Sequence, residues 1–298
     1  MKQPLFLLCA FLLCAGATFH VPSTSQQFRL TAVGDRLAFQ SIADYRKVVD
    51  QPDADLKATF LKTAASLGGF CSLKASPSST DGPAALIHDD YFKSILNPDL
   101  VVQIGEDIFR VNPQKQRVFV LKATLPDQYP DLLAENEANP NIRVFSTGQN
   151  VLDLIENPAL STATENQFCK ESGIGGYDRA TGLLPVSGNL GMEGKLHFNR
   201  FGIYYSLFAE VGTAQSGTLE LLIDLEPVQY HARCGVTNGP YNVYNYRSNS
   251  SPTFNYQKYQ SYQGSKNLNK VNFRGRFKAK IGGNVVKESH WIQIKVNY

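Results

Sequence analysis

The sequence predicts an α+β protein: an N-terminal α+β unit with a small antiparallel meander, followed by a C-terminal all-β, sandwich-like domain. Three observations support this class. Helix-type spacing of apolar residues is found only in the first half of the 298-residue chain. The spacing then changes from a period of 3.6 to a period of 2. From Gly194 onward nearly every segment alternates as a strand does. Helices followed by a run of strands are typical of α+β architecture.

The first 17 residues carry the features of a secretory signal peptide in the expected order. Lys2 supplies a positive charge, residues 5–14 form an unbroken apolar run, and Ala15-Gly16-Ala17 provides the small residues that signal peptidase recognises. The apolar run spans only about half of a bilayer core, and no later stretch approaches the length of a transmembrane helix. No lipid anchor is expected, because a leucine precedes each leader cysteine. We expect export to the medium, the periplasm or the cell surface.

Residues 23–160 are expected to form the α+β unit. Its first predicted helix begins after Ser41, which can cap the helix N-terminus. A second helix should end at Gly68-Gly69, since glycine favours the backbone that closes a helix. The predicted helices cover residues 41–49, 55–65, 89–96 and 149–156. The predicted strands cover residues 101–105, 106–111, 116–123 and 142–146, of which the first three form the meander.

Residues 175–298 are expected to form the β domain, after a segment rich in Gly, Ser, Thr and Asn. Several strand-like runs without an intervening helix favour a sandwich or a related antiparallel architecture. The runs cover residues 195–211, 218–234, 270–281 and 290–298. Residues 18–195 carry a net charge of −5 and residues 196–298 a net charge of +7.

Several segments are similar to a group of exported proteins from Bacteroidetes that has no assigned activity. The segments are FQSIADY (39–45), ILNPDLVVQIG (95–105), EDIFRVNPQKQRVFVL (106–121) and FGIYYS (201–206). Together they cover about a fifth of the chain, and none of them is a catalytic motif. The resemblance implies an exported protein and supplies no site residues.

A tract of tyrosines among Asn, Gln and Ser is the first candidate binding site. Its candidate ligand-binding residues are Tyr241, Tyr244, Tyr246, Tyr256 and Tyr259. Flat rings contribute contact area while amides and hydroxyls fix orientation, which suits recognition of sugars or peptides. The alternative is a set of strands whose tyrosines are half-buried for structural reasons.

A basic strand is the second candidate site. Arg274, Arg276 and Lys278 alternate with other residues, so their side chains share one surface of the strand. They could bind an anionic polysaccharide, the phosphate of lipid A or a nucleic acid. The alternative is structural, because Asp224 and Glu226 form a similar row on another strand and could pair with the basic row across a sheet.

The sequence gives little support for a catalytic site or a metal site. Asp224 and Glu226 could act as the two carboxylates of a glycosidase, but any alternating strand with two acids produces this spacing. His231 and Cys234 would face opposite sides of a strand. We therefore predict no catalytic residues, no metal site and no cofactor. After the leader the cysteines are odd in number (Cys71, Cys169 and Cys234), and we expect them to be small core residues.

These observations favour an exported, non-catalytic binding or surface-interaction protein. Its partner would be a glycan or a protein of the host or the cell envelope, and no nucleic acid is expected. The alternative is a secreted hydrolase that acts on polysaccharide or peptide. The sequence leaves the oligomeric state open.

Overall fold

The computed structural model describes most of the chain after the predicted signal peptide, which itself lies outside the described residues. The described ranges are 28–50, 52–77, 82–161, 177–213, 219–226, 228–230, 242–244, 253–254, 256–268 and 271–296. Within them, every helix is too short or too polar to cross a membrane.

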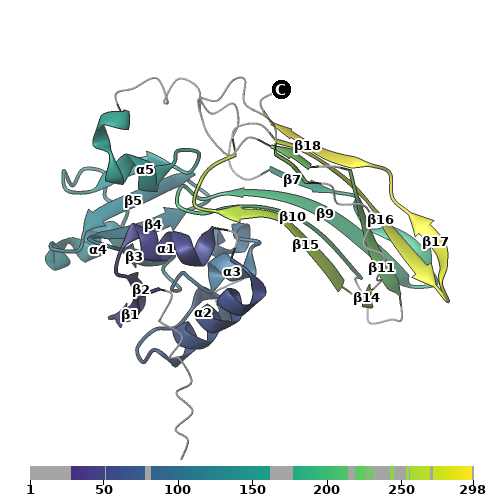
Figure 1. Cartoon of the computed structure of the whole chain (residues 1–298), viewed down its shortest axis with the longest axis horizontal. Coiled ribbons are helices and arrows are strands. Elements are labelled where there is room, and N and C mark those ends of the chain that lie inside the picture. The colour runs from purple at the N-terminus through teal and green to yellow at the C-terminus, as the bar shows by residue number, and fades with distance from the viewer. Residues whose placement is uncertain are drawn as a thin grey trace, which may run out of the picture.

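The α-helices of the described residues all lie in the N-terminal half (Figure 1). They are α1 (Ile42–Val49), α2 (Ala54–Ser66), α3 (Asp90–Lys93), α4 (Tyr129–Leu133) and α5 (Val151–Glu156). The predicted cap is confirmed, because the Ser41 hydroxyl accepts a hydrogen bond of 3.0 Å from the Asp44 backbone N–H. The helix predicted over residues 89–96 is shorter, since α3 ends at Lys93 and turns follow before Asn97.

A six-stranded sheet forms the centre of this half, in the order β1-β2-β3-β4-β5-β6. Its strands are β1 (Leu30–Val33), β2 (Arg36–Phe39), β3 (Val101–Ile104), β4 (Asp107–Asn112), β5 (Arg117–Lys122) and β6 (Arg143–Ser146). The predicted meander of β3, β4 and β5 is confirmed as antiparallel. The strands β1 and β2 were not predicted, and β2 pairs with β3 in parallel.

Two further antiparallel sheets make up the C-terminal half. A five-stranded sheet contains β7 (Tyr177–Ala180), β8 (Leu184–Ser187), β9 (Leu190–Arg200), β10 (Tyr205–Thr213) and β15 (Tyr256–Gly264). A seven-stranded sheet contains β11 (Glu220–Leu225), β12 (Val228–Tyr230), β13 (Asn242–Tyr244), β14 (Thr253–Phe254), β16 (Val271–Ile281), β17 (Asn284–Glu288) and β18 (Ile292–Val296). The chain is therefore an α+β protein.

One hydrophobic cluster joins the two C-terminal sheets. Leu196 and Phe198 of β9 belong to it together with Phe273 and Phe277 of β16. Side chains alternate along a strand, so the residues between these positions on β9 lie on the opposite face. We call this opposite face of the five-stranded sheet the outer face. In Figure 1 the long strands β9, β10 and β15 extend from the N-terminal half and curve beside β16.

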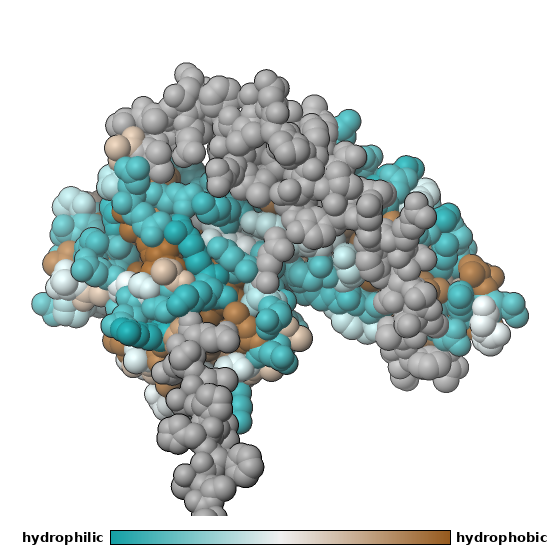
Figure 2. Space-filling view, viewed as in Figure 1, coloured by the Kyte–Doolittle hydropathy of each residue, from teal (hydrophilic) through white to brown (hydrophobic). Residues whose placement is uncertain are grey.

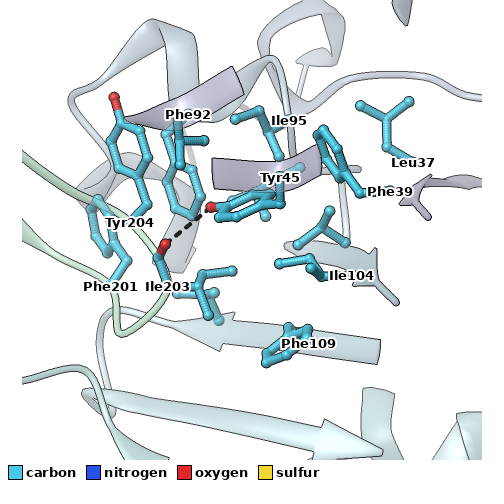
Figure 3. Packing of buried hydrophobic residues seen from close by; sticks show 14 of the residues in the cluster. Leu37, Phe39, Tyr45, Phe92, Ile95, Ile104, Phe109, Phe201, Ile203 and Tyr204 are labelled. Atoms are coloured by element: carbon cyan, nitrogen blue, oxygen red, sulfur yellow. Dashed lines mark hydrogen bonds between the residues drawn. The ribbon is translucent and has the colours of Figure 1, made fainter. Parts of the chain in front are cut away.

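The turn between β9 and β10 packs into the N-terminal core. Phe201, Ile203 and Tyr204 are buried in the same cluster as Tyr45 and Phe92. The Tyr204 ring stacks on Phe92 at 4.5 Å, and the Tyr45 hydroxyl donates to the Ile203 carbonyl over 3.1 Å (Figure 3). Segments from both halves thus share one core. The surface drawn in Figure 2 is mostly hydrophilic over both halves, with small apolar patches between polar side chains.

Candidate functional site

The outer face of the five-stranded sheet brings together five polar side chains, each from a different segment. Asp178 and His197 are directly opposite each other on the paired strands β7 and β9. Glu210 lies on β10 and Tyr256 on β15, while His88 reaches the same face from the segment just before α3. We call His88, Asp178, His197, Glu210 and Tyr256 the histidine network.

The network is a continuous chain of polar contacts. Asp178 Oδ2 lies 3.2 Å from His88 Nε2, and Asp178 Oδ1 lies 2.8 Å from His197 Nδ1. The other ring nitrogen of His197, Nε2, lies 3.2 Å from Glu210 Oε1. The Tyr256 hydroxyl donates to Glu210 Oε2 over 2.9 Å. Both nitrogens of His197 therefore face carboxylate oxygens.

This arrangement changes the protonation of the network. Burial lowers the pKa of His197, but hydrogen bonds and charge from Asp178 and Glu210 outweigh burial, so the pKa is raised. Burial raises the pKa of Asp178 and of Glu210, yet hydrogen bonds to the histidines prevail and both pKa values are lowered. Burial and the Glu210 carboxylate raise the pKa of Tyr256, so its hydroxyl remains a donor. The geometry thus favours a positively charged His197 between two carboxylates.

Aromatic packing fixes His197 in place. Only 3% of its side chain is exposed. Its ring stacks on Phe208 with 4.6 Å between centroids, and the His88 ring lies 4.8 Å away. The Lys258 ammonium lies 3.8 Å above the Phe208 ring. His197 therefore cannot turn freely, whereas 36% of the His88 side chain and 46% of the Asp178 side chain are exposed to solvent.

A small pocket lies at the Tyr256 end of the network. Its volume is about 160 Å³, and it is lined by Leu183, Glu193, Lys195, Glu210, Gly212, Thr213 and Tyr256. Tyr256 is 53% exposed, while its hydroxyl is held by Glu210. The pocket therefore combines a fixed, accessible aromatic ring with two carboxylates and an ammonium group.

The predicted tyrosine tract is only partly described. Tyr241 and Tyr246 lie outside the described residues, and Tyr244 ends β13. Tyr256 and Tyr259 lie on the same strand, β15. Tyr259 packs against the cluster between the two C-terminal sheets. Of the tyrosines whose side chains are described, Tyr256 is the one that lines the pocket.

The predicted basic row lies on β16, beside the acidic row of β11. Arg276 Nε lies 2.7 Å from Asp224 Oδ2, and Lys278 Nζ lies 3.0 Å from the same oxygen. Arg274 Nη1 lies 2.6 Å from Glu226 Oε1. The structural alternative, pairing of the two rows across the sheet, is therefore confirmed. Binding of an anionic ligand by this row stays a prediction.

The same contacts bear on the glycosidase alternative. Burial raises the pKa of Asp224, but Arg276 and Lys278 lower it more strongly. A general acid needs a raised pKa instead. Asp224 and Glu226 are therefore arranged as partners of the basic row.

The expectation that the cysteines are core residues is wrong for Cys71. Cys71 is an exposed free thiol, because it lies in the loop between the end of α2 and Leu73. Cys169 and Cys234 lie outside the described residues.

Local sequence patterns indicated Tyr256 but did not join the members of the histidine network. His88, Asp178 and His197 come from segments far apart in the sequence, so no local spacing joins them. The one available signal was the polar position of His197 between Leu196 and Phe198, which indicates the outward face of an amphipathic strand. The ring nitrogens of His88 and His197 and the carboxylate oxygens of Asp178 are of the type that holds a metal ion.

Comparison with protein-family models, curated proteins and solved structures gave no match for this chain.

Proposed function

We propose that this is an exported, non-catalytic binding protein that recognises a glycan at the outer face of the five-stranded sheet. The observation that carries the proposal is the Tyr256 pocket, where an accessible ring is held beside Glu193, Lys195 and Glu210. A sugar presents a weakly polar face that can stack on a ring and hydroxyls that can pair with charged side chains. The pocket offers both kinds of partner.

The size of the pocket supports part of a longer glycan as the ligand. A volume of about 160 Å³ is smaller than the roughly 300–1,000 Å³ of sites that enclose drug-sized molecules. A single sugar unit could enter while the rest of the chain lies along the sheet. The fixed Tyr256 ring lowers the entropic cost of binding, because its orientation is set before the ligand arrives.

The sequence indicates where the protein would act and which module would present the pocket. The predicted signal peptide would deliver the protein to the cell surface, the periplasm or the medium. The two C-terminal sheets would act as the sandwich-like module that presents the pocket. A protein partner at the envelope is the other binding class, and it would need a larger complementary surface than this pocket.

A glycan array tests the proposal directly. We expect the purified protein to bind a restricted set of glycans at physiological salt. Tyr256→Ala should weaken this binding by about fivefold, since stacking on an aromatic ring contributes on the order of 1 kcal/mol. Tyr256→Phe keeps the ring and should retain most of the affinity.

A variant of the basic row is the matched control. Arg274→Gln combined with Lys278→Gln should leave the salt-resistant binding unchanged, because both residues lie on the other sheet. Binding that disappears with salt and with this variant would instead identify a polyanion surface. The absence of any glycan ligand, or full binding by Tyr256→Ala, would contradict the proposal.

A further inference from the structure

Three side chains of the histidine network point metal-ligating atoms at one another. These atoms of His88, Asp178 and His197 all lie within 4.8 Å of each other. Asp178 is central, with one carboxylate oxygen 3.2 Å from His88 Nε2 and the other 2.8 Å from His197 Nδ1. Two imidazoles and a carboxylate are thus assembled from the segment before α3, β7 and β9.

The spacing is close to what a four-coordinate ion requires. Zinc–ligand bonds of about 2.0–2.2 Å place neighbouring donor atoms roughly 3.4 Å apart in a tetrahedron. The two contacts of Asp178 are somewhat shorter than that spacing and use different oxygens, Oδ2 toward His88 and Oδ1 toward His197. The remaining adjustment can come from His88 and Asp178, which are partly exposed, while the buried His197 keeps its position.

A second carboxylate supports His197 from behind. Glu210 Oε1 lies 3.2 Å from Nε2, and Tyr256 in turn donates to Glu210. A histidine that binds a metal through one nitrogen usually donates its other N–H to a carboxylate, which fixes the tautomer and the ring orientation. Glu210 fulfils this condition and leaves Nδ1 directed toward Asp178.

The donor set indicates the class of ion. Calcium and magnesium prefer sites made of oxygen atoms, whereas imidazole nitrogen favours zinc and its first-row neighbours. Three protein ligands leave a fourth position of a tetrahedral site. A water molecule can reach it, because Asp178 and His88 are partly exposed.

We propose that His88, Asp178 and His197 bind one divalent transition-metal ion of the zinc class, with Glu210 as the carboxylate that orients His197. The ion takes the place of the proton that otherwise lies between His197 and Asp178. It also links the segment before α3 in the N-terminal half to strands β7 and β9 of the C-terminal half. This site goes beyond glycan binding, which depends on the pocket next to Tyr256.

Zinc binding by the purified protein is the test. The experiment uses protein without a polyhistidine tag. Bound metal is first removed with a chelator, and the protein is then titrated with Zn²⁺ under equilibrium dialysis. We expect one tightly bound Zn²⁺ per chain. His88→Ala and Asp178→Asn should each weaken binding by about 100-fold or more, and Glu210→Gln by about 10–100-fold.

A matched control and a second readout separate loss of the site from loss of the fold. His290→Ala removes an exposed histidine just before β18 and should bind Zn²⁺ as the unaltered protein does. Co²⁺ in place of Zn²⁺ should give the visible absorption of a four-coordinate site, and this absorption should vanish in His88→Ala while its circular dichroism remains native. Failure of the unaltered protein to bind Zn²⁺ tightly would overturn the proposal. So would equal affinity in His88→Ala and Asp178→Asn.

Discussion

Two charged positions of the C-terminal half show how surroundings decide the role of a side chain. Asp178 and Asp224 are both aspartates on strands, and both have a lowered pKa. Asp178 is held by two histidines beside solvent, where the proposed metal ion would replace a proton. Asp224 is held by Arg276 and Lys278, whose charges no ion would replace. The first arrangement is suited to binding and the second to stabilising the sheet.

Asp224 should make the stability of the protein depend on pH. Its pKa is lower in the folded chain than in the unfolded chain, so its contribution is present above pH of about 4 and is lost as the pH falls through the folded-state value. We expect Asp224→Asn to lower the free energy of unfolding by about 1–2 kcal/mol at neutral pH and by much less near pH 2. Urea unfolding at the two pH values measures the difference.

The exposed Asp127 provides the control for this experiment. Asp127→Asn should change the free energy of unfolding by less than about 0.5 kcal/mol at either pH. An equal loss for Asp224→Asn at both pH values would show that its charge does not stabilise the fold.

At the scale of elements, close packing of the two C-terminal sheets requires glycine at particular positions. An added Cβ at Gly194 of β9 would lie 2.0 Å from the Phe277 ring of β16. An added Cβ at Gly275 of β16 would lie 2.8 Å from the Leu225 side chain and 3.2 Å from the Leu196 side chain. Small residues at both positions let the two C-terminal sheets pack closely.

Gly194→Ala should therefore destabilise the protein. The new methyl group must displace the buried Phe277 ring, and overpacking of this kind costs about 1–3 kcal/mol. Thermal or urea unfolding measures the loss. Gly68→Ala is the control, since a Cβ there meets no atom within 4 Å, and it should change stability by less than about 0.5 kcal/mol. Equal stability of the two variants would contradict the close approach of the sheets.

Local patterns predicted the elements whose residues carry their own signals. Ser41 and the apolar spacing after it located α1, and strict alternation located β16 and its basic face. The strands β1 (LTAV) and β2 (RLAF) lack a strict alternation of apolar and polar residues, so the period of a strand did not mark them. The histidine network escaped prediction for a different reason. Its contacts arise only when β7 pairs with β9 and the segment at His88 folds over them.

At the scale of the whole molecule, the β9–β10 turn ties the two halves together. Phe201, Ile203 and Tyr204 belong to the N-terminal core although they connect strands of a C-terminal sheet (Figure 3). The end of β15 adds a hydrogen bond of 3.2 Å from Gln263 Nε2 to the Val49 carbonyl of α1. These contacts predict that the halves unfold together.

Two spectroscopic probes can test this cooperativity, because each reports on a different half. Trp291, the only tryptophan of the chain, lies just before β18, whereas the helices of the described residues lie in the N-terminal half. We expect Trp fluorescence and helical circular dichroism to follow one transition with the same midpoint. Tyr204→Ala should lower that midpoint for both probes, since loss of a buried aromatic side chain costs about 3–5 kcal/mol. Separate midpoints in the unaltered protein would show that the halves unfold independently.

The location of a bound glycan tests the central claim of a binding site at the outer face. Hydrogen–deuterium exchange would be measured with and without the strongest ligand from the array, at a saturating concentration. We expect slower exchange in β9, β10 and β15 around Glu210 and Tyr256, with exchange in the seven-stranded sheet unchanged. Protection confined to β11, β16 and β18, around the basic row, would contradict the claim.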